Sequence, residues 1–297
     1  MTQHPDFTLV CGGGGVWGVA WMTGLANGLA SAGVDLRDAA TFIGTSAGSV
    51  VSTQLARGLD LERLFARQTN PAQQPREPVP DASNMSRLME LIRGRWHDER
   101  QRRTAMCKAA LEASTIGVAE RRVNIKERLG LQDEAWPSRP LYITAIDAET
   151  MELTVFDGGS GVSVIDAVAA SCAVPGVWPP ASINGRRYID GGVSGTSDNA
   201  LLAAGARRVL ILSPAGNSDG SAFGGASRLA EEVARLEESG ATVVAITPDE
   251  QSLNARVFGV LDPASRKPAA VAGKAQARAE VAALAHLWAR SGEDDPR

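Results

Sequence analysis

The sequence has 297 residues, of which 44% are hydrophobic and 22% are charged, and its formal net charge is −4 at pH 7. A chain of this length and composition buries a sizeable core, which excludes a disordered, a collagen-like or a disulfide-stapled protein. The slight acidic excess also argues against a nucleic-acid partner, because duplex-binding domains normally carry a basic surplus.

The cysteines and the N-terminus indicate the compartment. The three cysteines form no Cys-x-x-Cys motif and no Cys/His cluster, so the sequence predicts neither a disulfide framework nor a zinc site. The N-terminal residues do not resemble a signal peptide, and no apolar run approaches the roughly 18 residues of a membrane span. We therefore expect a cytoplasmic protein, with any membrane contact at the periphery.

Strands and helices alternate in the first fifty residues. The apolar run 7–11 ends at four glycines, and 17–32 carries large apolar residues at helical spacing. A second apolar run, 41–43, meets Gly44 and then a stretch of small residues that becomes helical. This alternation predicts an α/β fold with a parallel sheet covered by helices on both faces.

Residues 71–104 interrupt this alternation. Four prolines fall between positions 71 and 80, and six arginines then surround Trp96, which predicts an insertion made of a loop and one or two charged helices. Two interpretations of its surface stand. The arginines and Trp96 suit an anionic membrane, whereas Asp98 and Glu99 interrupt the basic run as they would on an ordinary solvated helix face.

Regular structure returns after the insertion. We expect helices over 118–129, from Ile165 to before Pro175, and in the Ala-rich C-terminal segment. Short apolar runs predict strands at 141–145, 153–156, 188–189, 209–212 and 243–246. The chain contains no internal repeat and no linker long enough to separate domains, so we expect one α/β domain.

The segment Gly44-Thr45-Ser46-Ala47-Gly48 lies between a predicted strand and a predicted helix. A G-x-S-x-G turn in this context lifts the serine hydroxyl out of the sheet, and the N-terminus of the following helix favours developing negative charge. Gly44 and Gly48 are required because side chains there would collide with neighbouring backbone. Ser46 is therefore a candidate nucleophile, with a plain glycine turn as the alternative.

Four consecutive glycines precede the first predicted helix. They leave backbone N–H groups uncovered and allow positive φ, so Gly13, Gly14 and Gly15 are candidates for an oxyanion hole. Together with Gly18 they also satisfy the dinucleotide-binding fingerprint, which makes a nucleotide site the competing interpretation. That fingerprint expects an acid after the second strand, where this sequence has the serine turn, and this favours the oxyanion hole.

Asp190 ends a short predicted strand and is followed by Gly191 and Gly192. Asp-Gly alone commonly marks a turn, but beside the other two motifs it presents a carboxylate as a candidate base. The histidines are poorer candidates, because His4 lies in the terminal tail and His97 in the Arg-rich insertion. His286 keeps some claim, since the order Ser…Asp…His matches that of α/β-hydrolases, but it lies in the middle of the last predicted helix rather than on a loop after a strand.

In this order, the three motifs resemble those of the patatin-like phospholipases, which use a Ser–Asp dyad without a histidine. Residues 170–180 are similar to the family's Ala-Ser-x-Ala-x-Pro…Pro-Pro segment. The resemblance implies a three-layer α/β/α fold with a mainly parallel central sheet. It also implies a patatin-like domain over residues 7–275, with the insertion at about 71–104 and a C-terminal helix, 268–290, packed on the domain.

Carried over to this sequence, the resemblance implies that Ser46 is the nucleophile, that Asp190 is its base and that Gly13, Gly14 and Gly15 form the oxyanion loop. The remaining motif glycines are Gly18, Gly44, Gly48, Gly191 and Gly192. The substrate implied is a lipid or other acyl ester, cleaved through an acyl-enzyme by a phospholipase A, lysophospholipase or carboxylesterase reaction without metal or organic cofactor.

The sequence departs from the family at Trp17, where an Arg or Lys is usual. Trp17 either lines an acyl pocket or packs in the core. Two other functions stay open: a nucleotide-binding protein that uses the glycine loop, and a catalytically idle family member that acts as a binding module.

Overall fold

The computed structural model describes residues 7–75, 81–216, 228–256 and 259–288. Within them the chain forms eight strands of one sheet. The strands are β1 (Thr8–Cys11), β2 (Thr41–Thr45), β3 (Leu141–Asp147), β4 (Leu153–Phe156), β5 (Ala181–Ile183), β6 (Arg186–Asp190), β7 (Arg208–Leu212) and β8 (Thr242–Ile246). All five strands expected after the insertion are present, and β5 is one that the sequence analysis did not predict.

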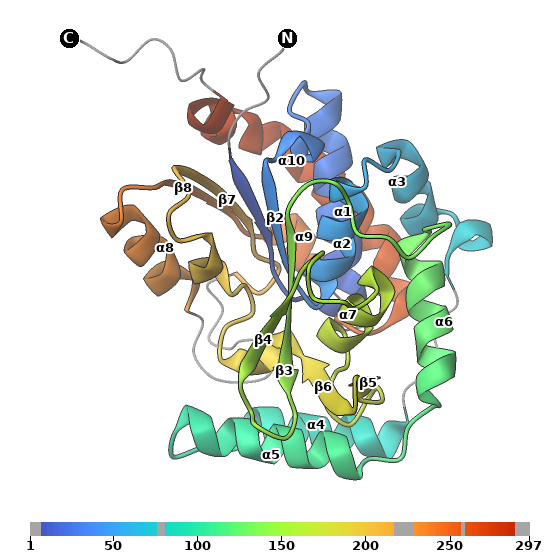
Figure 1. Ribbon diagram of the computed structural model, residues 1–297. Helices are drawn as coiled ribbons and strands as arrows, with labels where there is room; N and C mark the ends of the chain where they lie inside the picture. The colour runs from blue at the N-terminus through green and yellow to red at the C-terminus, as the bar shows by residue number, and fades with distance from the viewer. Residues whose placement is uncertain (1–6, 76–80, 217–227, 257–258, 289–297) are drawn as a thin grey trace.

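Helices flank the sheet (Figure 1). They are α1 (Gly15–Ser31), α2 (Ala47–Ala56), α3 (Leu61–Thr69), α4 (Ala82–Arg93), α5 (Glu99–Glu112), α6 (Val118–Leu129), α7 (Val164–Ser171), α8 (Leu229–Glu238), α9 (Glu250–Asn254) and α10 (Arg266–Trp288). Short 3-10 turns are η1 (Leu36–Asp38), η2 (Pro71–Gln73), η3 (Gly191–Ser194), η4 (Ala200–Ala203) and η5 (Pro263–Ser265). The sequence analysis missed α3, α8 and α9.

Most of the sheet is parallel. The strands β3, β2, β1, β7 and β8 lie side by side in that order and pair in parallel. The strands β4, β5 and β6 join antiparallel at the β3 end. The predicted α/β fold with a mainly parallel central sheet is confirmed.

The central strands β1, β2 and β7 are buried on both faces, which explains why they are continuous apolar runs. On β1, Leu9 and Cys11 pack into the large core that α1, α2, α7 and α10 share, whereas Val10 between them packs on the opposite face. That second face is covered by α8 and η4 near β7. Near β3 and β6 it is covered by α4 and α5 (Figure 1).

Small residues let the C-terminal helix approach α1 closely. A Cβ atom added to Gly24 of α1 would lie 2.0 Å from the carbonyl oxygen of Ala270, and one added to Gly273 of α10 would lie 2.3 Å from that of Trp21. The side chain of Gln276 then accepts a 3.0 Å hydrogen bond from the indole N–H of Trp21. The close backbone contact between α1 and α10 therefore depends on Gly24 and Gly273.

Two strands meet end to end along one edge of β3. Residues 143–144 of β3 pair with both β2 and β4, and residues 145–146 pair with both β4 and β6. Since a strand has only two edges, β2 and β6 must share one of them, running in opposite directions. Their C-terminal residues therefore meet: Thr45 pairs with Thr144, and Asp190 pairs with the next residue, Ala145.

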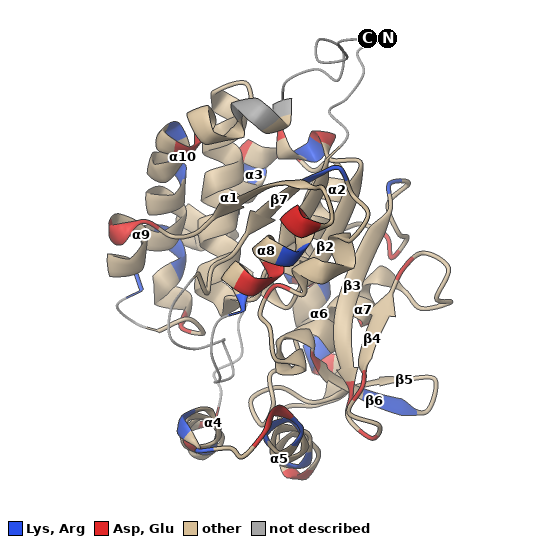
Figure 2. Cartoon of the chain, turned by 90° about the vertical axis from the view of Figure 1, so that its left-hand side faces the viewer, with Lys and Arg blue, Asp and Glu red and all other residues tan. Residues whose placement is uncertain are grey.

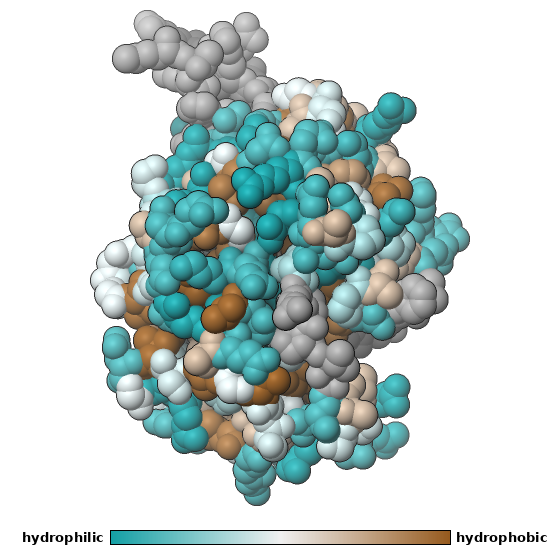
Figure 3. All heavy atoms as spheres, turned by 90° about the vertical axis from the view of Figure 1, so that its right-hand side faces the viewer, coloured by the Kyte–Doolittle hydropathy of each residue, from teal (hydrophilic) through white to brown (hydrophobic). Residues whose placement is uncertain are grey.

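The described part of residues 71–104 contains η2, α4 and the start of α5. Figure 2 shows basic and acidic residues side by side on α4 and α5. The face of the molecule in Figure 3 is mostly hydrophilic, with apolar residues scattered singly across it. None of the helices in the described ranges combines the length and the apolar character needed to cross a membrane.

Candidate active site

Ser46 occupies the sharp turn between β2 and α2. Its φ of 52° and ψ of −117° place a non-glycine residue in the positive-φ region, which costs about 1–3 kcal/mol. The turn makes Ser46 the N-cap residue of α2, and the side chain of Ser171 accepts its N–H at 2.8 Å. The strain is stored at the one residue whose side chain the motif presents.

The motif glycines are explained by close approaches. A Cβ on Gly48 would lie 1.8 Å from the carbonyl oxygen of Cys11, and one on Gly44 would lie 2.5 Å from the Cα of Ser49. A Cβ on Gly191 would lie 2.3 Å from the hydroxyl of Thr144. Each glycine therefore permits a close approach that a side chain would block: Gly44 to the start of α2, Gly48 to the end of β1 and Gly191 to β3.

Ser46 and Asp190 are in direct contact although 144 residues separate them. The Ser46 hydroxyl donates a 2.7 Å hydrogen bond to Oδ2 of Asp190, and the Gly192 N–H donates a 2.9 Å bond to Oδ1. Asp190 is fully buried, whereas Ser46 keeps 7% of its surface exposed. The carboxylate of Asp190 accepts two hydrogen bonds and has no access to solvent. Ser46 is the more exposed residue of the pair.

Burial raises the pKa of Asp190 from 3.8 to about 7, because removal from water penalises the charged carboxylate. The hydrogen bonds from Ser46 and Gly192, and the positive charge of Arg121 on α6, oppose this rise. A carboxyl group with a pKa near neutrality is a better base toward a hydroxyl than an exposed aspartate.

Several further residues hold the Ser46 turn through hydrogen bonds. The hydroxyls of Thr45 and Thr144 lie 2.8 Å apart, and the Asn199 side chain donates to Thr45 at 3.0 Å. The Cys172 thiol donates to the carbonyl oxygen of Ser46 at 3.2 Å. Sequence reasoning did not identify Thr45, Thr144 or Asn199 as supports, because their contacts depend on the register of β3.

The glycine loop lies beside Ser46. A Cβ on Gly13 would lie 3.6 Å from the Ser46 Cβ. The N–H of Gly13 is already donated to the carbonyl oxygen of Ser197 at 2.8 Å, and that of Gly18 is donated to Gly14 within the first turn of α1. Among the described residues, no hydrogen bond is donated by the N–H of Gly14 or Gly15. The free donors of the loop are therefore these two.

A second buried acid lies behind this loop. Asp198 accepts a 2.9 Å hydrogen bond from Ser213, and a Cβ on Gly12 would lie 1.8 Å from its Oδ1. Burial, reinforced by the negative charge of Glu232, raises the pKa of Asp198 to about 7. Within the described part of the chain, no three His, Cys, Asp or Glu side chains gather where they could hold a metal ion.

Trp17 belongs to the core. Its side chain is fully buried and stacks on Trp21 with the ring centroids 6.2 Å apart, and the Arg256 guanidinium lies 5.5 Å from its ring. Of the histidines, His97 is exposed between α4 and α5. His4 and the side chain of His286 lie outside the described residues.

Comparison with known proteins assigns the family. The model of the family described as patatin-like phospholipase matches residues 9–203, about two thirds of the chain. The chain belongs to the patatin-like phospholipase family. This membership supports lipid hydrolase activity.

Several solved structures are similar to this patatin-like chain. VipD from Legionella pneumophila is 12% identical with a TM-score of 0.46, and the match covers 95% of this chain and 67% of VipD. The type III effector ExoU is 15% identical with a TM-score of 0.41, covering 97% of this chain and 54% of ExoU. ExoU in complex with SpcU, from Pseudomonas aeruginosa, is 18% identical with a TM-score of 0.39, covering 93% and 53%. The chain thus spans about half the length of ExoU.

Proposed function

We propose that this chain is a serine acyl hydrolase that cleaves fatty-acyl ester bonds of lipids through a dyad of Ser46 and Asp190. The observation that carries the proposal is the 2.7 Å hydrogen bond from the Ser46 hydroxyl to the fully buried carboxylate of Asp190. It joins a strained serine at a helix N-terminus to a base whose pKa lies near neutrality.

The reaction proceeds in two halves. Asp190 takes the Ser46 proton as the serine oxygen attacks the ester carbonyl, and the tetrahedral intermediate collapses to an acyl-serine when this proton passes to the departing alcohol. Asp190 then takes a proton from water as that water attacks the acyl-serine. The fatty acid leaves, and Ser46 recovers its proton from Asp190.

The free N–H groups of Gly14 and Gly15 are proposed to stabilise the oxyanion. Removing one such donor typically costs about 2.7–4 kcal/mol of transition-state stabilisation. Gly13 has a different part in the proposal: its N–H anchors the loop to Ser197, and its lack of a side chain leaves room beside Ser46.

A fluorophosphonate probe is expected to label the chain, and peptide mapping is expected to find the label on Ser46. Such probes react with serines activated by a base, so a serine in a plain glycine turn stays unlabelled. A screen of phospholipid, lysophospholipid and simple carboxylic esters then separates the reaction types. Heat protection by NAD or ATP without labelling points instead to the nucleotide-binding alternative, and an unreactive Ser46 without such protection points to an idle binding module.

Activity is expected to rise with pH through about 7. Asp190 must be ionised to accept the serine proton, and burial holds its pKa near 7 in the folded chain. The kcat/KM for a soluble nitrophenyl ester, measured from pH 5 to 9, should fall about tenfold per pH unit below 7. A profile that stays level down to pH 5 would contradict Asp190 as the base.

We also propose that the patatin-like domain extends beyond the family match to residue 275. The strand β7 pairs with β1, β8 pairs with β7, and α10 packs along α1, so these later elements continue the same sheet and core. Peripheral contact with a lipid surface is part of the proposal, because the substrate class resides there.

A further inference from the structure

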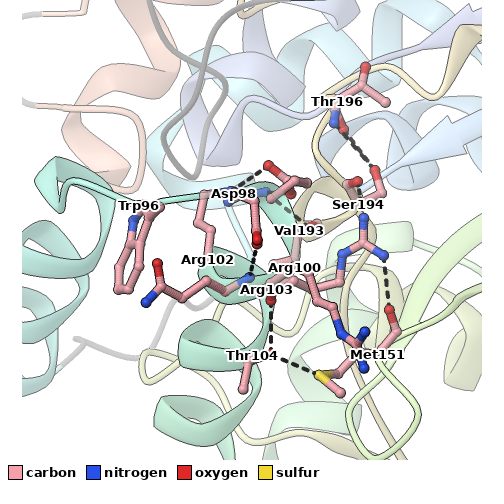
Figure 4. Close-up of polar contacts among 12 residues, drawn as sticks. Trp96, Asp98, Arg100, Arg102, Arg103, Thr104, Met151, Val193, Ser194 and Thr196 are labelled. Carbon is pink, nitrogen blue, oxygen red and sulfur yellow. Dashed lines mark hydrogen bonds and ion pairs between the residues drawn. The ribbon is translucent and has the colours of Figure 1, made fainter.

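The turn that follows Asp190 ends on two carbonyl groups that α5 binds. This turn is η3, residues 191–194. The buried guanidinium of Arg102, 2% exposed, donates a 3.1 Å hydrogen bond to the carbonyl oxygen of Val193. The next residue, Arg103, donates to the carbonyl oxygen of Ser194 (Figure 4). Cations at the C-terminal carbonyls of a helical turn are favourably placed.

Each arginine is fixed at a second point. The Nε of Arg102 donates to Glu99 at 3.0 Å, and Nη1 of Arg103 donates to the carbonyl oxygen of Met151 in the turn between β3 and β4 at 3.0 Å. Figure 4 shows the contact between Arg103 of α5 and Met151. Arg102 therefore joins α5 to η3, and its bond to Glu99 of the same helix holds the guanidinium in place. Because an arginine donates in several directions from one rigid plane, Arg103 joins η3 to the turn between β3 and β4.

Glu99 also fits the end of the turn. Gly195 has a φ of +107°, and a Cβ there would lie 3.0 Å from the carboxyl carbon of Glu99. The first turn of α5 is therefore packed directly on the residue that ends η3. Apolar contacts also join α5 to η3, since Met106 and Cys107 of α5 share a buried cluster with Val193.

The geometry of η3 determines the surroundings of the Asp190 carboxylate. Gly192, which donates to Oδ1 of Asp190, is the second residue of the turn, and Val193 follows it. On its other side the turn is held by Asn199, whose side chain donates to the carbonyl oxygen of Gly191 at 3.4 Å and accepts from the Ser194 hydroxyl at 2.8 Å. Because Val193 directly follows Gly192, a shift of the Val193 carbonyl group, which Arg102 binds, moves the Gly192 amide, which binds the Asp190 carboxylate.

We propose that Arg102 and Arg103 are positioning residues for Asp190, which they hold in register with Ser46 by fixing the last two carbonyl groups of η3. The inference rests on the proposed function above. It makes the insertion a structural part of the active site, rather than a separate lid or a solvated appendage. Neither arginine touches the reacting atoms, and both act through the turn.

The test replaces both arginines by lysine, which keeps their charge but lacks the rigid planar set of donors that makes both contacts of each arginine at once. A soluble nitrophenyl ester serves as substrate. The double variant Arg102→Lys/Arg103→Lys should lose about tenfold to a hundredfold in kcat, since small misplacements of a reacting group cost that much, with KM within about threefold of wild type. The matched control is Arg100→Lys, an exposed arginine on the same helix, which should behave as wild type.

The pH profile separates positioning from general loss of structure. The groups that act on the pKa of Asp190 are its burial, the Ser46 hydroxyl, the Gly192 amide and the Arg121 guanidinium from α6. If η3 loosens, water reaches the carboxylate, and since burial is the largest of these influences, the acid limb of kcat/KM should move below pH 7. A variant that is merely less stable keeps the wild-type limb at any temperature where it remains folded.

The proposal is overturned if the folded double variant keeps wild-type kcat and acid limb, or if Arg100→Lys loses as much activity. A loss of activity that only follows the folded fraction, measured by circular dichroism, also overturns it. Should the double variant not fold, the single Arg103→Lys variant is judged by the same criteria, because Arg103 is only half-buried. An inactive wild-type chain in this assay rejects the proposed function itself, which distinguishes the two failures.

Discussion

Ser46→Ala is expected to abolish ester hydrolysis while leaving the fold intact. The substitution removes the attacking oxygen, and in serine hydrolases the loss of the nucleophile lowers kcat by about 10⁴-fold to 10⁶-fold. The fold should survive because alanine occupies the same backbone conformation and the N–H bond to Ser171 is unaffected. The measurements are hydrolysis of a nitrophenyl ester and a thermal melt.

Ser52→Ala is the matched control for this substitution. Ser52 is a fully buried serine on the same helix, and its hydroxyl donates to the carbonyl oxygen of Ile43 rather than to Asp190. Losing that bond should cost about 1 kcal/mol of stability but leave hydrolysis near wild type. Wild-type turnover by Ser46→Ala would remove the basis of the proposed mechanism.

Asp190→Asn should reduce hydrolysis by about 10³-fold to 10⁴-fold, comparable to disabling the acid of a catalytic triad. The amide has nearly the same shape but cannot accept the Ser46 proton. The comparison variant is Asp198→Asn, because Asp198 is equally buried and its pKa is also raised to about 7. Asp198 contacts Ser213 instead of Ser46, so its replacement should keep hydrolysis within about tenfold of wild type.

The Asp190→Asn variant should be more stable than the wild type at neutral and alkaline pH. The folded pKa of Asp190, about 7, lies above the unfolded value of 3.8, so the folded chain binds the proton more tightly. The free energy of unfolding of the wild type therefore falls as pH rises from about 4 to about 7, and above pH 7 this loss does not increase further. Asparagine does not ionise, so the advantage of Asp190→Asn in urea unfolding should grow over this window. Equal stability of both chains at pH 8 would contradict a buried, ionised Asp190.

The sequence by itself determined the parts of the fold that depend on local backbone demands. The glycines at 44 and 48 require a sharp turn after a strand, and the apolar runs on either side require a buried sheet. These demands are met within a few residues of chain, so the three motifs and most strands could be predicted. The helices α3 and α8 were missed although their buried leucines recur at helical spacing, Leu61 and Leu64 in α3 and Leu229 and Leu236 in α8.

Only the tertiary structure decided which of these parts meet. The contact between Ser46 and Asp190 follows from β2 and β6 sharing one edge of β3, a register set by packing on both sheet faces. The same holds for the Gly13 amide, which Ser197 engages. The sequence likewise placed Arg102 in a charged segment, and only the structure shows that this residue is buried and contacts η3. Such contacts join segments far apart in the chain, and no short stretch of sequence carries the information that selects one pairing over another.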